Sequence, residues 1–114
     1  MDNIPNDEEL VRVLAEEGMD GAAWWSVVNA RASTRDPEYP GQYRTWNPLT
    51  DADDMLMLIK AMKKKEWWVD IENHTKWHVE FLLCNKVGVM FQADNDDFKR
   101  AVSNAAFLTL KKGL

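Results

Sequence analysis

Two histidines, one cysteine and several carboxylates are the side chains of this sequence that could do metal or nucleophilic chemistry. His74 and His78 stand four residues apart, with Glu72 and Glu80 on either side of them. On a strand this spacing places both imidazoles on one face, where a carboxylate could add an oxygen ligand to a metal ion. Histidines on the surface of a hairpin account for the same residues, because no third strong ligand is fixed by the sequence. We therefore expect no metal and no cofactor.

Cys84 is the only cysteine, so the chain can form no internal disulfide. A catalytic thiol needs a base that is itself held by a third group, and His78, six residues away, has no evident orienting partner. The sequence also contains no glycine-rich phosphate loop, no nucleophile elbow and no carboxylate pair placed for acid–base catalysis. We expect a buried, inert thiol and a protein that is not an enzyme.

Tryptophan is the residue type that stands out, with six in 114 residues. Tryptophan and arginine are enriched at the energetic centres of interfaces, because a large rigid ring gains contact area at a small entropy cost. Trp67 and Trp77 fit core positions. The predicted binding surface combines the other tryptophans with two arginines: Trp24, Trp25, Arg35, Arg44, Trp46 and Trp68. The alternative is that these rings only fill the core.

The first half of the chain predicts one helix followed by a long irregular segment. Asn6 or Asp7 can cap a helix whose apolar stripe begins at Leu10. Gly18 lies near its end. Residues 21–49 show no sustained period, and they hold most of the aromatic and arginine residues, so we expect a long aromatic loop there.

The second helix combines several independent signals. Thr50 is the predicted N-cap, with Asp53 three residues further on as in a capping box. Lys63 and its two following lysines lie where the helix dipole favours cations. The apolar residues recur at helical spacing: Met55, Leu58, Ile59 and Met62.

From Trp67 onward the apolar residues alternate with a period of two, which predicts three short antiparallel strands with one apolar face. Turns are predicted at 73–76 and 85–86, and a helix over 98–110 follows the acidic segment 94–97. The predicted apolar face is formed by Trp67, Val69, Ile71, Trp77, Val79, Phe81, Val87, Val89 and Phe91. The fold class is therefore α+β, a three-stranded antiparallel meander packed by helices in the order α-loop-α-β-β-β-α. If both faces of the sheet are covered, it becomes an α/β/α sandwich.

Length and charge narrow the class of protein. A chain of 114 residues is the size of one domain, so we expect a single domain over residues 1–114. A net charge of -5 argues against non-specific binding to nucleic acid or to an anionic membrane. The acidic start lacks the pattern of a signal peptide, and no apolar run approaches the roughly 20 residues that cross a bilayer. We expect a cytoplasmic protein.

Three segments resemble a known family. They are residues 10–19 (LVRVLAEEGM), residues 46–54 (WNPLTDADD) and the alanine- and leucine-rich closing helix over 98–110. The order of these segments and their amino-acid sequences resemble the phage ABA sandwich domain, a group of small bacteriophage and prophage proteins. The double tryptophans and the insert from Ala23 to Tyr43 depart from that pattern. The resemblance implies a phage origin and a sandwich of helices and sheet, and it brings no catalytic residues.

Together these observations predict a non-enzymatic bacteriophage accessory protein that acts by binding. Its expected partner is a host protein, and its expected role is that of a host-directed or anti-defence inhibitor. One alternative is a protein that sequesters a nucleotide-like small molecule between tryptophans, with Arg31, Arg35, Arg44 or Lys76 for the phosphate. Another is a structural phage protein that forms homo-oligomers.

Overall fold

The N-terminal helix changes its winding halfway along. In this computed structural model, which describes residues 4–86 and 88–113, α1 (Asp7–Val13) runs directly into a single π-helical turn, η1 (Leu14–Gly18). Asn6 caps the helix, because its side-chain oxygen accepts a backbone N–H bond of 2.9 Å. The predicted start of the first helix is confirmed.

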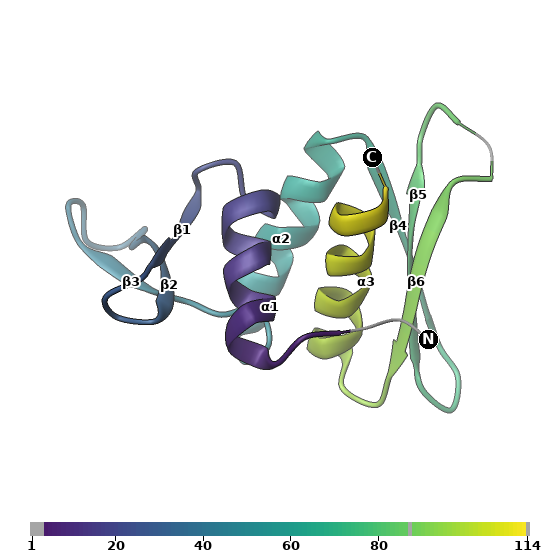
Figure 1. The fold of residues 1–114 in the computed structure, drawn as a ribbon, viewed down its shortest axis with the longest axis horizontal. Coiled ribbons are helices and arrows are strands. Elements are labelled where there is room, and N and C mark those ends of the chain that lie inside the picture. Colours follow the sequence, from purple (N-terminus) through teal and green to yellow (C-terminus); the bar gives the residue numbers. More distant parts are fainter. Residues whose placement is uncertain (1–3, 87, 114) are drawn as a thin grey trace.

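The segment predicted as a long aromatic loop, residues 21–49, instead contains a three-stranded antiparallel sheet, so that prediction is wrong (Figure 1). Its strands are β1 (Ala23–Ser26), β2 (Arg31–Arg35) and β3 (Tyr43–Trp46). Strands of four or five residues place only two or three side chains on each face. Their alternation is therefore too short to register as a period. We call this the small sheet.

The second helix, α2 (Ala52–Lys64), lies where the sequence predicts it, and its apolar stripe is buried. Its cap differs from the prediction. Asp51 is the N-cap, and its carboxylate accepts N–H bonds from Asp53 at 2.8 Å and Asp54 at 3.1 Å. Thr50 lies one residue too early for this role, because an N-cap side chain bonds the N–H groups two and three residues further on, and for Asp53 and Asp54 that residue is Asp51.

The predicted meander is confirmed as a second sheet, the large sheet, of β4 (Trp67–Asn73), β5 (Trp77–Leu83) and β6 (Met90–Asn95). Its inner rows are the predicted apolar ones, with Phe81 of β5 between Val69 and Phe91, and Val79 between Ile71 and Ala93. The predicted member Val87 lies outside the described residues, and Val89 precedes the third strand. The chain then enters α3 (Phe98–Lys112), which Asp97 caps.

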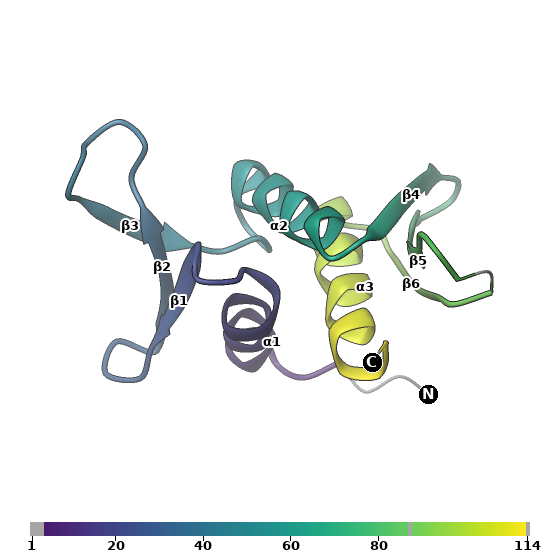
Figure 2. The same cartoon turned by 90° about the horizontal axis from the view of Figure 1, so that it is seen from above.

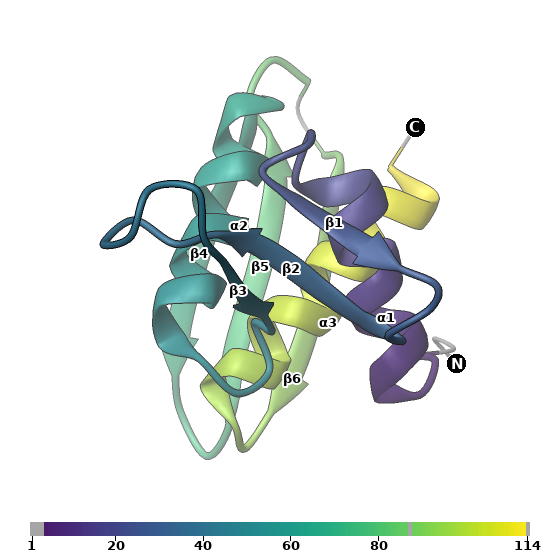
Figure 3. The same ribbon diagram turned by 90° about the vertical axis from the view of Figure 1, so that its left-hand side faces the viewer.

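The helices lie between the two sheets. Figures 1 and 2 show α3 against the large sheet, with α1 and α2 between α3 and the small sheet. Figure 3 shows the small sheet lying across the helices. The α+β class is confirmed, and the third layer is a sheet rather than a further set of helices. Both sheets consequently keep one face turned away from the core. No helix within the described residues is both long and apolar enough to cross a membrane.

Candidate functional site

The six predicted binding residues do not form one surface. Pleating of the small sheet turns Trp25, Arg44 and Trp46 toward the helices, in line with the buried Ala32 and Thr34 of β2. Trp46 is fully buried, so it belongs to the core. Trp24 and Arg35 point outward from the same sheet. Trp68 is 59% exposed and lies on the outer face of the large sheet, across the helical layer.

Arg44 is held by a carboxylate of α2. Its Nη1 atom lies 2.8 Å from Oδ1 of Asp54, and the Asp54 side chain is 1% exposed. The two groups do not meet at a hydrogen-bonding angle, so their attraction is mainly electrostatic. The other oxygen of Asp54 accepts the N–H of Asn47 at 2.8 Å. Arg44 therefore neutralises a buried charge and joins β3 to α2.

The outer face of the small sheet carries a different arrangement. The rings of Trp24 and Tyr43 meet edge to face, with their centroids 5.3 Å apart and their planes at 88°. Arg31 and Arg35 point outward from the central strand, and neither has an ion-pair partner within the described part of the chain. We call these four residues the basic aromatic face.

Two members of this face were missing from the predicted binding set. Arg31 entered only the nucleotide alternative, and Tyr43 was assigned to the loop. The signal that locates Tyr43 is the alternation from Tyr43 to Trp46, in which one tyrosine and one threonine face outward while one arginine and one tryptophan face inward.

The large sheet carries an acidic cluster around His78 on its outer face. The Nδ1 atom of His78 lies 2.5 Å from the carboxylate of Asp94, and Nε2 lies 2.7 Å from that of Glu80. These two hydrogen bonds, the one to Glu80 first, raise the pKa of His78 above its ordinary value of 6.5. Among the described residues no group of three or more histidines, cysteines and carboxylates is arranged to hold a metal ion.

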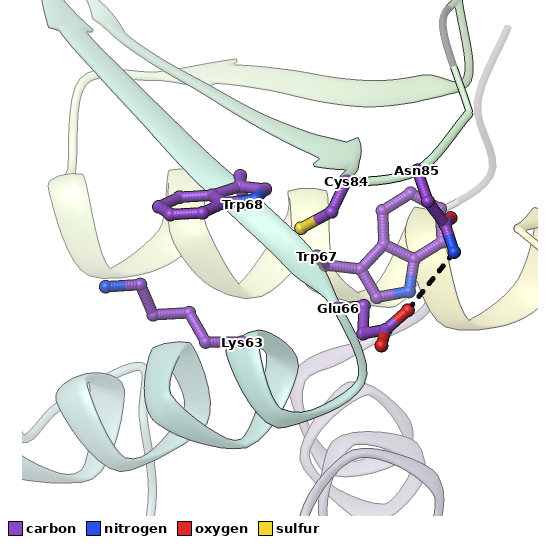
Figure 4. Close-up of a pocket in the computed structure, with 6 residues that line it drawn as sticks. All are labelled: Lys63, Glu66, Trp67, Trp68, Cys84 and Asn85. Atoms are coloured by element: carbon purple, nitrogen blue, oxygen red, sulfur yellow. Dashed lines mark hydrogen bonds between the residues drawn. The ribbon is translucent and has the colours of Figure 1, made fainter.

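A cavity of about 400 Å³ opens where α2 ends and β4 begins (Figure 4). It is lined by Lys63, Glu66, Trp67, Trp68, Cys84 and Asn85. The ammonium group of Lys63 lies at one end. At the other end the carboxylate of Glu66 accepts a long hydrogen bond of 3.4 Å from Asn85. The walls between them are largely indole and thiol.

Cys84 is exposed, which corrects the prediction of a buried thiol. It follows the last residue of β5, so the sheet no longer covers it. His78 lies near the other end of that strand. Six residues of extended chain span about 20 Å, and both nitrogens of His78 already contact carboxylates. The two side chains therefore form no nucleophile–base pair.

No family model, no curated protein and no solved structure matches this chain. The resemblance to the phage ABA sandwich domain stays a prediction.

Proposed function

We propose that the protein acts by binding another protein through its basic aromatic face, rather than by catalysis. The observation that carries this proposal is the pairing of Trp24 with Tyr43 beside Arg31 and Arg35, two arginines that no carboxylate of the described chain neutralises. An edge-to-face aromatic pair is rigid, so it offers apolar area at little entropy cost. Guanidinium groups beside it favour a carboxylate in bidentate geometry.

The chemistry of the face specifies the partner. It fits a protein surface that presents carboxylates around an apolar residue. The resemblance stated above adds that this partner is a host protein and that binding inhibits it, as expected of a host-directed or anti-defence factor. Acidic residues elsewhere on this chain would repel the same partner, which favours docking in one orientation.

The geometry of the rings favours a protein over a nucleotide. A base held between two rings needs them parallel and roughly 7 Å apart, twice the contact distance of carbon atoms. Trp24 and Tyr43 are instead perpendicular and in contact, with centroids 5.3 Å apart. A nucleotide could stack on one ring only.

Affinity capture followed by titration tests the proposal. The full chain would be immobilised on a resin and incubated with a bacterial lysate. The captured protein would then be identified and purified, and its binding to this chain would be measured by calorimetry. Arg35→Glu should weaken binding at least about tenfold, the effect of losing one close interfacial charge pair. Trp24→Ala should weaken it by a similar factor. Lys60→Glu is the matched control, since it reverses an exposed charge on α2, away from the face.

The outcomes are distinguishable. Equal binding by Arg35→Glu, Trp24→Ala and the unmodified chain would contradict the assignment of this face. A fluorescence titration with nucleoside mono- and triphosphates supplies the second arm. Saturable quenching that Trp24→Ala abolishes would favour the sequestering alternative over a protein partner.

A further inference from the structure

The turn between β1 and β2 presents two valines to solvent. Val27 is 86% exposed and Val28 is 94% exposed, the highest values among the large apolar residues of the described chain. Turns favour residues that set backbone geometry or bond to it, such as glycine, asparagine and serine. These valines belong to neither group, and most of their surface is open to solvent. We call them the valine tip.

The cavity beside Trp68 is the complementary feature. Its walls are mostly apolar, and Trp68 begins an exposed apolar row that crosses the large sheet through Leu82 to Met90. Trp68 is 59% exposed and Met90 is 48% exposed. A cavity of about 400 Å³ has the size of a small-molecule pocket. The side chains of two valines are small enough to enter it.

We propose that the valine tip of one molecule docks into the cavity beside Trp68 of a second copy of this chain. The charges beside the valine tip and beside the cavity are also complementary. Arg31 pairs with Ser26 at the base of the tip and has no ion-pair partner within the described chain. At the cavity, Glu66 also has no ion-pair partner within the described chain, and Lys63 lies at the opposite end of the cavity (Figure 4). Arg31 would therefore approach the Glu66 end, which fixes the orientation.

The positions of tip and cavity define the kind of assembly. Figure 1 places the small sheet at one end of the long axis and the large sheet at the other. Where a single tip–cavity contact joins two molecules, the contact is heterologous, and its repetition produces open chains or a ring. A tip of two valines buries far less than the roughly 1,200 Å² of a stable interface. The association is therefore weak and reversible.

The test measures molar mass by light scattering across a concentration series in the presence of a reductant. The unmodified chain should grow from monomer toward longer species as its concentration approaches about 1 mM. The double variant Val27→Asp, Val28→Asp removes the tip at exposed positions and should stay monomeric. Trp68→Asp alters the cavity wall and should also stay monomeric. Leu56→Asp, on an exposed position of α2, is the matched control and should behave like the unmodified chain.

Mixing gives the sharpest result. The tip variant keeps its cavity and the Trp68→Asp variant keeps its tip, so the mixture should form dimers and nothing longer. Alkylation of Cys84, which lines the cavity, supplies a second readout that does not depend on Trp68→Asp folding correctly. Its rate should fall with concentration in the unmodified chain and stay constant in the tip variant.

A monomer over the whole concentration series, or equal association by the tip variant, would overturn the proposal. It goes beyond the proposed function, because the valine tip and the cavity lie outside the basic aromatic face and the two surfaces share Arg31 alone. A tip variant that still binds the captured partner while losing self-association would separate the two proposals.

Discussion

Arg44 and Asp54 form an ion pair at the boundary between the small sheet and α2. Among the ion pairs of the described residues, theirs is the one in which the carboxylate is withdrawn from water, at 1% exposure. Arg44→Ala should cost about 3 kcal/mol of unfolding free energy, because it leaves that carboxylate buried without its cation. The estimate is at the low end for a buried pair, since Arg44 keeps 29% of its side chain exposed. A urea melt measures it.

The control for this variant is Arg35→Ala on the outer face of the same sheet. Because Arg35 has no partner within the described chain, its loss should change stability by less than about 0.5 kcal/mol. Equal melting of the two variants would show that the pair with Asp54 contributes nothing to the fold.

His78 gives a prediction about pH. Glu80 and Asp94 raise the folded-state pKa of His78 above its ordinary value of 6.5. The protonated imidazole therefore stabilises the fold fully below pH 6.5, and this contribution is lost as the pH rises through the raised pKa. His78→Gln should destabilise the protein more just below pH 6.5, where the carboxylates are still ionised, than in alkaline buffer.

Melting curves of the unmodified protein and of His78→Gln, recorded from just below pH 6.5 to alkaline pH, check the prediction. Glu80→Gln is the companion variant, because removing the largest cause should lower the pKa of His78 in an NMR titration. A difference in stability between the unmodified protein and His78→Gln that does not change with pH would contradict the prediction.

At the element scale, α2 provides the clearest packing test. Ile59 is 9% exposed and faces the core, whereas Leu56 on the same helix is 48% exposed. Ile59→Ala should cost about 2–5 kcal/mol, from lost burial and the cavity that remains. Leu56→Ala should cost much less. A loss under about 1 kcal/mol for Ile59→Ala in a denaturant melt would show that this side of α2 packs loosely.

The elements that could be predicted from sequence are those long enough to repeat their period. α2 has 13 residues and the strands of the large sheet have six or seven, so caps, alternation and turns agree there. The small sheet was missed because each strand is only four or five residues long. Its first turn also ends with Ala30 at a φ of 51°, a conformation that favours glycine or asparagine at that position.

The candidate site was predictable in composition but not in arrangement. Of the tryptophans and arginines predicted to bind in residues 21–49, Trp24 and Arg35 face outward from the small sheet, and their role in binding stays a prediction. Which side chains share that face depends on strand register, since a shift of one residue exchanges the two faces. Trp46 and Arg44 therefore lie on the core side, and Tyr43 replaces them outside.

At the scale of the whole molecule, the small sheet depends on the helices for its burial. Its inner face is closed by Trp46, which is fully buried, and Ala32, which is 1% exposed. The hydroxyl of Thr34 donates to the Ala22 carbonyl at 2.7 Å, and Arg44 joins β3 to α2. A sheet of three short strands is marginal alone, so its stability should come from these contacts.

We therefore expect both sheets to unfold in one cooperative transition. Hydrogen exchange under native conditions should give the backbone amides of Ala32 and Thr34 in the small sheet the same opening free energy as those of Val79 and Phe81 in the large one. The contacts of Trp46 and Arg44 are the reason, because opening the small sheet would expose a full indole and leave Asp54 buried without its cation. If the small-sheet amides exchanged with a free energy lower by several kcal/mol, the small sheet would be a separate unit that opens alone. Arg44→Ala should produce that uncoupled behaviour, and its exchange pattern is the positive control.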